Sequence, residues 1–238
     1  TNGAYAINVM NGATLTINGG KYYGGGTAVQ VEKGTANING GTFACEPYSN
    51  PTYGYKFLIN CIDAAYKNGT AKVSIKGGSF VNYDPSDSAS ENPIGNFCAS
   101  GYVAVKGSTD DAPVWTVEDH RVAEVGNIGY STLADAVAAA NNGDTVTLLK
   151  NTAEDVVIPA DKTITLDLNG KKLTNVASHT IFNKGTLSIN GNNGTVDNVT
   201  NGTAAVYNDV TGKVTINGGS YTRSAEASKD ENNSGGNS

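Results

Sequence analysis

Short runs of alternating apolar and polar residues recur along this chain, and a pair of glycines follows the clearest of them. In the first such run, Leu15 and Ile17 are separated by hydroxyl and amide residues. This period of two predicts a short strand with one buried face. The glycine pair at 19–20 tolerates positive φ without steric cost, which favours a tight corner. Tyr22 follows two residues later and begins the next strand.

The whole unit of strand, glycine corner and aromatic residue is repeated. Close copies occupy residues 13–22, 34–43, 71–80 and 212–221, and a degenerate copy occupies residues 185–192. A spacing of about 20 to 30 residues is typical of solenoids, in which a repeat buries its apolar face only by stacking on its neighbours. We therefore predict an all-β, right-handed parallel β-helix. Asn-Gly pairs also suit the antiparallel hairpins of a sandwich or barrel, but such a fold gives no reason for whole repeats to resemble one another.

Two interruptions break the pattern, and the second of them divides it into two consecutive β-helical segments. Residues 45–65 contain several tyrosines and prolines and predict a protruding loop, followed by a strand at 57–62. Residues 83–118 leave the repeat pattern and close the first segment. The predicted domains are residues 1–118, the C-terminal part of a first β-helix, and residues 119–238, the start of a second.

Residues 121–149 differ from the rest and predict a strand–helix–strand cap for the second β-helix. The only predicted helix is 131–142, because Thr132 and Asp135 are spaced like a capping box and Gly143 stands at a helix-stop position. Such a cap would cover the strand edges and core side chains that an open solenoid end exposes.

Composition agrees with a turn-dense β protein and argues against some partners. Apolar residues make up 38% of the chain and charged residues only 16%, and there are 30 glycines. The 16 basic and 22 acidic residues leave a formal charge of −6, without a basic block that could follow a phosphate backbone. We therefore expect no nucleic-acid partner. No apolar run approaches the ~20 residues of a membrane-spanning helix, so no membrane insertion is expected.

The two ends of the sequence also suggest a context. Thr1 falls within the repeat pattern, and we interpret the chain as a segment of a longer protein, from which a signal peptide could have been lost. Residues 226–238 are polar and rich in Gly, Ser and Asn, and we expect them to be solvated.

Three cysteines, Cys45, Cys61 and Cys98, lack the Cys-x-x-Cys spacing of a metal or redox motif. Their apolar or small-residue contexts favour free, buried thiols, and a Cys45–Cys61 disulfide stays open as the alternative. Zinc is not favoured, because His120 and His179 are far in the sequence from each other and from any cysteine pair.

Several stretches together carry a resemblance to a known family. They are VAEVGNIGYSTLADAVAAANNGDTVTLL, ITLDLNGKKLTN, the endings INGGSY and INGGTF, and NFCASGYVAV. These stretches resemble pectate-lyase-like β-helix repeats, which occur in large surface proteins of anaerobic gut bacteria and in virion appendages of their phages. The resemblance implies a non-catalytic extracellular structural or adhesive module, a rigid spacer on a cell or virion surface whose partners are surface glycans or proteins. The alternatives are a virion appendage or capsid-decoration protein of a gut phage, and a polysaccharide lyase or carbohydrate-binding module.

The same resemblance makes enzymatic activity a question. Lyases of this family bind Ca²⁺ through clustered acids and use an arginine or lysine as the base, whereas the only arginines here are Arg121, at the domain junction, and Arg223, beside the polar tail. Glycoside hydrolases need two carboxylates about 5 to 9.5 Å apart. On adjacent coils these would appear as Asp recurring at one repeat position, and no such recurrence is present. We assign no catalytic residue and no metal ligand, and leave the question of an enzyme open.

Three groups of carboxylates fall in segments that we expect to be turns. They are Asp84, Asp87 and Glu91; Asp110 and Asp111; and Glu118 and Asp119. Solvation is the usual state of such acids, although the first group also offers the hard oxygen ligands of a Ca²⁺ site, which is the one cofactor we consider. We expect Asp167 to point outward from its strand, and Trp115 to plug the end of the first core.

Tyrosines are the best candidates for a binding surface, because aromatic faces stack on the apolar faces of sugars and loops over a rigid scaffold often carry function. The candidate ligand-binding residues are Tyr22, Tyr23, Tyr48, Tyr53 and Tyr55. The structural alternatives are corner packing for Tyr22 and simple anchoring of the loop for the others.

Overall fold

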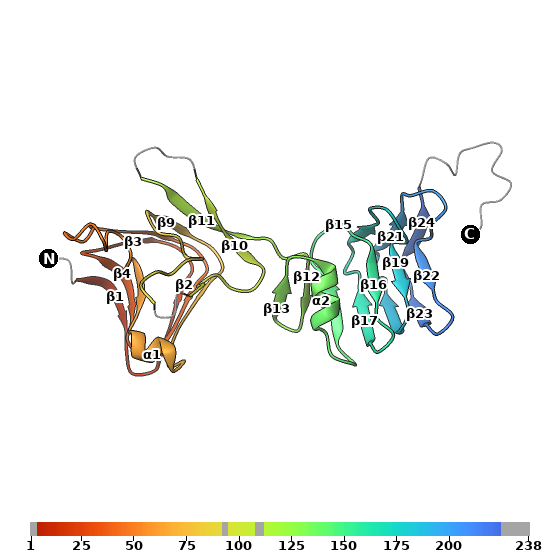
Figure 1. Ribbon diagram of the computed structural model, residues 1–238, viewed down its shortest axis with the longest axis horizontal. Helices are drawn as coiled ribbons and strands as arrows, with labels where there is room; N and C mark the ends of the chain where they lie inside the picture. Colours follow the sequence, from red (N-terminus) through yellow and green to blue (C-terminus); the bar gives the residue numbers. More distant parts are fainter. Residues whose placement is uncertain (1–3, 92–94, 108–111, 225–238) are drawn as a thin grey trace. The chain divides into compact units, whose positions relative to one another are not determined.

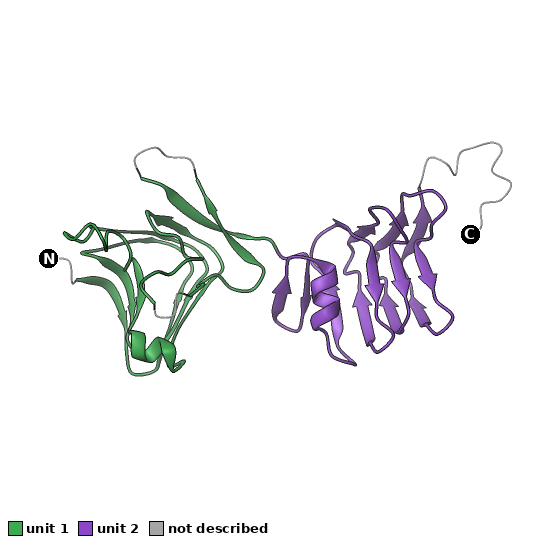
Figure 2. Cartoon of the chain, viewed as in Figure 1, with its two compact units in different colours: residues 1–120 green, residues 121–238 purple. Residues whose placement is uncertain are grey.

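The computed structural model describes residues 4–91, 95–107 and 112–224, and the chain divides into two compact units, residues 1–120 and 121–238 (Figure 2). Nearly all elements are short strands, and most pair in parallel with a strand one turn of the chain away (Figure 1). The prediction of an all-β fold of stacked parallel coils is therefore confirmed, and the repeats do not form antiparallel ribbons. Each unit is a β-solenoid and is described by itself.

The first unit contains three coils of three strands each. The strands of the coils are β1 (Tyr5–Val9), β2 (Ala13–Ile17), β3 (Lys21–Gly24), β4 (Thr27–Val31), β5 (Gly34–Ile38), β6 (Thr42–Cys45), β7 (Ile59–Cys61), β8 (Ala71–Ile75) and β9 (Ser79–Val81). Equivalent strands form three sheets, β1-β4-β7, β2-β5-β8 and β3-β6-β9, all in parallel register. Each of the three coils in this unit thus contains one copy of the repeated sequence.

Register places identical positions of the repeats above one another. Ile17 and Ile38 are partners in β2 and β5, and Ile38 and Ile75 are partners in β5 and β8. The aromatic position does the same: the ring centroids of Phe43 and Phe80 are 5.0 Å apart with an interplanar angle of 7°. Such columns bury each apolar side chain against its counterpart in the next coil, which a single repeat cannot do alone.

The Gly-Gly corners serve two purposes. The second glycine of a pair has positive φ, 103° at Gly20 and 114° at Gly41, which glycine adopts without steric cost. The first glycine lets adjacent coils approach, because a Cβ on Gly77 would lie 2.5 Å from the carbonyl oxygen of Asn39. Positive φ follows from the local turn, whereas the close approach follows from stacking.

The first unit ends in an antiparallel hairpin that replaces the coil pattern. β10 (Tyr102–Lys106) pairs with β11 (Val114–Asp119), and β11 pairs antiparallel with β9. Trp115 is the register partner of Phe80 and packs, partly buried, against the core of this unit, in agreement with its expected place at the end of the core. Glu118 and Asp119 were expected in a turn, and this prediction is wrong because both belong to β11, where they are exposed. Asp110 and Asp111 lie outside the described residues, as do residues 226–238.

The segment after β6 is a loop, as predicted, and the strand that follows it is shorter than the predicted 57–62. A short helix, α1 (Asp63–Lys67), then connects β7 and β8. The prediction that 131–142 holds the only helix is therefore wrong. The sequence Asp-Ala-Ala-Tyr-Lys suits one helical turn, with an acid in the first turn and a base in the last.

Within the described residues 121–224, the second unit contains three further coils and part of a fourth. Its coil strands are β14 (Thr145–Leu148), β15 (Thr152–Ala153), β16 (Val156–Ile158), β17 (Thr163–Asp167), β18 (Lys172–Thr174), β19 (Ile181–Asn183), β20 (Thr186–Asn190), β21 (Thr195–Asn198), β22 (Val206–Asn208), β23 (Lys213–Asn217) and β24 (Ser220–Arg223). They form the sheets β14-β17-β20-β23, β15-β18-β21-β24 and β16-β19-β22. Asp167 faces outward between the buried Leu166 and Leu168, as expected.

The second unit begins with a hairpin and a helix instead of a coil. β12 (Ala123–Val125) pairs antiparallel with β13 (Ile128–Tyr130) and with β14, and α2 (Leu133–Ala139) buries three residues on the same core. The Oγ1 of Thr132 accepts a hydrogen bond from the N–H of Asp135 at 3.0 Å, and Glu154 accepts from the first two helical N–H groups at 2.9 and 3.0 Å. Lys162 donates to two carbonyl oxygens at the other end. Side chains of the first coil therefore satisfy both helix ends.

Each unit has its own apolar core. Among the residues that the structure describes, neither short helix has the length and apolar character that crossing a membrane requires.

Candidate functional site

The structure separates the candidate tyrosines into different environments. Tyr22 belongs to the ring column of the first unit, 5.0 Å from the Phe43 centroid, and its hydroxyl donates to the carbonyl oxygen of Gly19 at 2.8 Å. Tyr23, the next residue, points away from that column and is 63% exposed. Tyr55 packs against the core. Tyr22 and Tyr55 are thus placed as packing residues, and Tyr23 as a surface residue.

Tyr48 and Tyr53 lie together in the loop between β6 and β7. The centroid of Phe57 is 5.0 Å from that of Tyr48 and 5.7 Å from that of Tyr53, and the two tyrosines are 6.4 Å apart. The Nζ of Lys56 is 6.0 Å from the centroid of Tyr53 and 5.7 Å from that of Phe57. We call Tyr48, Tyr53, Lys56 and Phe57 the loop aromatic cluster.

Backbone hydrogen bonds within the loop hold this cluster in place. The N–H of Tyr48 donates to the carbonyl oxygen of Gly54 at 2.8 Å, and the N–H of Lys56 donates to that of Tyr53 at 2.7 Å. Gly54 has a positive φ of 43°. Leu58 follows directly and is fully buried. The rings therefore sit on a loop with its own hydrogen bonds, anchored by a buried leucine.

The chemistry of the loop aromatic cluster suits binding. Tyr53 is 43% exposed, and Tyr48 and Phe57 are partly exposed. Exposed ring faces can stack on the apolar C–H face of a sugar, and an ammonium beside them can donate to hydroxyl or carboxylate oxygens. The cluster carries no carboxylate, thiol or imidazole. Its composition is therefore that of a recognition surface without a general acid–base pair.

Two of the four members were not candidates from the sequence. Phe57 was assigned to a strand at 57–62, whereas the strand begins only at Ile59. Lys56 was not considered. The signal that could have found them is the density of aromatic residues in one loop, because rings that do not fit a strand alternation tend to pack on one another.

Comparisons with known proteins do not assign this surface. No model of a protein family matches the chain, and neither a curated protein nor a solved structure matches it significantly. The fold rests on the register of the strands, and function has to be argued from the chemistry of the surfaces.

The acids considered as a Ca²⁺ site do not converge. Within the described part of the chain, no group of three or more His, Cys, Asp or Glu side chains is placed to hold a metal ion. The Oδ1 of Asp84 instead accepts hydrogen bonds from the N–H and the hydroxyl of Ser86, at 2.9 and 2.6 Å. Asp84 therefore stabilises its own turn.

Glu91 was expected to be solvated, and this prediction is wrong because only 3% of the residue is exposed. Its Oε1 accepts hydrogen bonds from the N–H of Cys61 and the hydroxyl of Ser90, both at 2.9 Å. Its Oε2 is buried without a hydrogen-bond partner among the described residues. Burial raises the pKa of Glu91 above its ordinary value, although the two hydrogen bonds oppose the shift. The segment after β9 folds back over β7, which local sequence does not reveal.

The three cysteines are free thiols. Cys45 and Cys61 are buried, and Cys98 is half-buried. Burial, and then the nearby Glu91 carboxylate, raises the pKa of Cys61 to about 12. Burial likewise raises the pKa of Cys45 and of Cys98 to about 11. The thiols are thus protonated at neutral pH and are poor nucleophiles.

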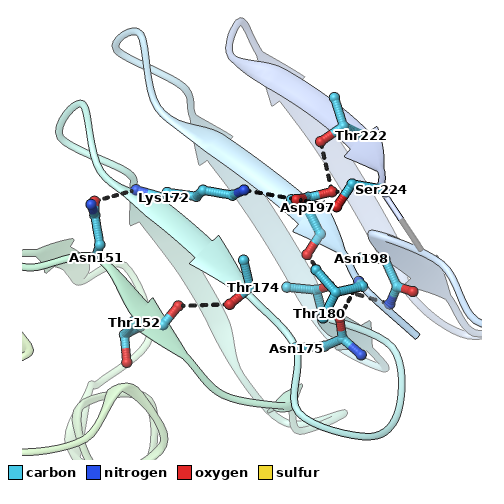
Figure 3. A network of polar contacts seen from close by, with 11 residues as sticks. Asn151, Thr152, Lys172, Thr174, Asn175, Thr180, Asp197, Asn198, Thr222 and Ser224 are labelled. Atoms are coloured by element: carbon cyan, nitrogen blue, oxygen red, sulfur yellow. Dashed lines mark hydrogen bonds and ion pairs between the residues drawn. The ribbon is translucent and has the colours of Figure 1, made fainter. Parts of the chain in front are cut away.

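Asp197 is the most deeply buried carboxylate among the described residues of the second unit, and Figure 3 shows its polar network. Lys172 contacts its Oδ2 at 2.8 Å, and Thr222 and Ser224 donate to its two oxygens at 2.9 and 2.8 Å. Burial by itself would raise the pKa of Asp197, but the hydrogen bonds from these three side chains outweigh burial and hold the pKa below its ordinary value. Both oxygens are occupied, so Asp197 joins β18, β21 and the end of β24.

Proposed function

We propose that this chain is a non-catalytic β-solenoid module, displayed outside a cell or on a virion, that contacts glycans through the loop aromatic cluster. The observation that carries this proposal is the convergence of Tyr48, Tyr53 and Phe57, with Lys56 beside them, on an anchored loop over stacked coils. A cluster of exposed rings on a protein surface is a recurrent feature of recognition sites.

The structural part of the proposal is supported by the coils themselves. Each coil is held by parallel sheets and by columns of apolar side chains, so a unit resists bending and local unfolding over its stacked length. The resemblance to pectate-lyase-like repeats of gut-bacterial surface proteins and of phage appendages supports the placement outside a cell. In either setting the module acts as a spacer that carries a binding surface.

The non-catalytic part is supported by the state of the charged residues. Arg121 pairs with Glu124 at 3.5 Å, and Arg223 donates to Asn201 at 2.9 Å. Asp197 has both oxygens engaged, as described above. A uronate lyase would need a base beside an acidic metal site, and no group of three or more His, Cys, Asp or Glu side chains among the described residues is placed to hold the metal.

A glycan array probed with the 238-residue chain tests the binding function. For the best-binding oligosaccharide, we expect Tyr53→Ala and Phe57→Ala each to weaken binding roughly five-fold in calorimetry, since an aromatic contact is worth about 1 kcal/mol. Tyr23→Ala, at an exposed ring outside the cluster, is the matched control and should leave affinity unchanged. Equal affinity of all three variants and the wild-type chain would contradict the proposal.

A separate assay addresses catalysis. Uronate polymers incubated with the chain and Ca²⁺ should show no increase in the ultraviolet absorbance of unsaturated products. Turnover that disappears on chelation would refute the non-catalytic assignment and favour a polysaccharide lyase.

A further inference from the structure

The outer face of the sheet β16-β19-β22 differs from its neighbour in the second unit. Figure 1 shows the three strands side by side, and their parallel register aligns Val157, Phe182 and Tyr207 in one column. All three occupy the outward position of their strands, with Val157 47% and Tyr207 44% exposed. On the neighbouring sheet, the outward positions of β17 and β20 carry only hydroxyl, amide and carboxylate residues. An apolar column on a polar solenoid surface is therefore a specific feature of this face.

Three rings meet on this face. The ring of His179, from the turn before β19, stacks on Tyr207 with centroids 4.4 Å apart and an interplanar angle of 19°. Phe182 meets Tyr207 edge to face at 5.3 Å and lies 6.0 Å from His179. We call His179, Phe182, Lys184 and Tyr207 the β19–β22 aromatic face. Mutual packing holds its rings in place before any ligand arrives, which lowers the entropic cost of binding.

Two polar groups complete the face. The N–H of Ala204 donates to Nδ1 of His179 at 3.0 Å, which puts the ring proton of the neutral imidazole on Nε2. The Nε2–H of His179 has no acceptor among the residues that the structure describes. The Nζ of Lys184 stands 4.7 Å from the centroid of Phe182 and forms no ion pair with any described residue. Ring faces therefore lie beside two hydrogen-bond donors.

A hollow of about 270 Å³ opens beside His179 and Tyr207, and Phe182 does not line it. His179, Thr203, Tyr207 and Asn208 contribute to its lining. Its size is near the lower end for small-molecule sites, and its lining combines aromatic, hydroxyl and amide groups. A pyranose ring presents a matching chemistry, with an apolar C–H face and a rim of hydroxyls.

From this geometry we infer that the hollow on the β19–β22 aromatic face is a second saccharide-binding site, in which a sugar ring packs against Tyr207 while its hydroxyls accept a hydrogen bond from Nε2 of His179. This site lies in the other unit from the loop aromatic cluster, and the inference does not rest on that cluster. Two sites on one chain would let it bind an immobilised polysaccharide more tightly than a short oligosaccharide, because the second contact becomes intramolecular.

The test uses the 238-residue chain and a glycan array of neutral, uronate and N-acetylhexosamine chains. The best-binding soluble oligosaccharide is then titrated while NMR follows the ring signals of His179 and Tyr207. We expect these signals to shift on binding, Tyr207→Ala to weaken affinity at this site roughly ten-fold, and Tyr207→Phe to keep affinity within about three-fold because the ring remains. Val210→Ala, at a 95% exposed turn residue, is the matched control and should have no effect.

Tyr53→Ala separates the two sites. If the inference holds, this variant keeps the ligand-induced shifts of His179 and Tyr207, even where it loses the binding assigned to the loop aromatic cluster. Three outcomes would overturn the inference: no glycan shifts these signals in the wild-type chain, a folded Tyr207→Ala variant binds as the wild type does, or Tyr53→Ala abolishes all binding.

Discussion

Phe43 offers the sharpest test of how the first unit is held together. It is fully buried, and its ring stacks at 5.0 Å on Tyr22 on one side and at 5.0 Å on Phe80 on the other. It is therefore the central member of the ring column that joins the three coils. Removing this ring interrupts the column at its middle and leaves a cavity between two coils.

The magnitude of the effect follows from burial and stacking. Phe43→Ala should lower the free energy of unfolding of the first unit by about 3–5 kcal/mol, the usual cost of deleting a buried phenylalanine ring. Phe43→Leu keeps much of the apolar volume but loses two ring stacks of about 0.5–1.5 kcal/mol each, so we expect a loss of about 1–3 kcal/mol. Tyr23→Ala, at the exposed neighbouring residue, should change stability by less than about 0.5 kcal/mol.

The chain contains its own reporter for this measurement. Its single tryptophan is Trp115, which packs against the core of the first unit. Urea titrations followed by tryptophan fluorescence therefore report the unfolding of that unit, while far-UV circular dichroism follows both. With a slope of about 2 kcal/mol per molar urea, Phe43→Ala should move the fluorescence midpoint by roughly 2 M.

The urea midpoint at which the second unit loses its dichroism should not change, because that unit has a separate core. Two results would refute the argument. One is a loss of unfolding free energy for Phe43→Ala, followed by fluorescence, below about 1 kcal/mol. The other is an equal loss for the Ala and Leu variants. In the first case the ring column would not contribute the predicted stability. In the second case ring stacking would make no contribution of its own.

Three further changes have defined outcomes. Glu91→Gln should stabilise the first unit near pH 7 and have little effect near pH 4. The pKa of this buried carboxyl is raised, so the wild-type chain loses stability as the pH rises through and above the ordinary glutamate range. Equal effects of the substitution at both pH values in urea titrations would contradict this. Asp197→Asn should destabilise the second unit by roughly 2 kcal/mol near pH 7. The difference from the wild-type chain should disappear as the pH falls through the lowered pKa of Asp197 in the folded chain. Thermal melts followed by dichroism over that pH range would check this, and a difference that persists in acid would argue against the mechanism. Iodoacetamide near pH 8 should modify Cys98 slowly and Cys45 and Cys61 more slowly still, because burial raises all three pKa values; rapid labelling of a folded chain in mass spectrometry would count against these assignments.

Much of the fold could be predicted from local patterns. The alternation around Ile17 predicts a strand, and its recurrence around Ile38 and Ile75 predicts stacking, which the parallel register confirms. The cap at Thr132 could also be predicted, because its hydrogen bond spans only three residues. The helix at Asp63–Lys67 escaped prediction, since five residues are too few to show a helical period.

The candidate surfaces were predicted only in part. Tyr48 and Tyr53 were named from the sequence, but their meeting with Phe57 depends on the path of the loop. His179 and Tyr207 are separated by a full coil in the chain, and their stacking was not foreseen.

The sequence by itself determined what neighbours along the chain decide: the strand alternation, the turn at each second glycine, and the capped start of α2. Only the tertiary structure decided which side chains of different coils meet. It gave the first glycine of a pair its role in close packing, buried Glu91 where its own segment folds back over β7, and brought His179 against Tyr207. The physical reason is that coil length and loop path set the register between distant residues, and no local period encodes that register.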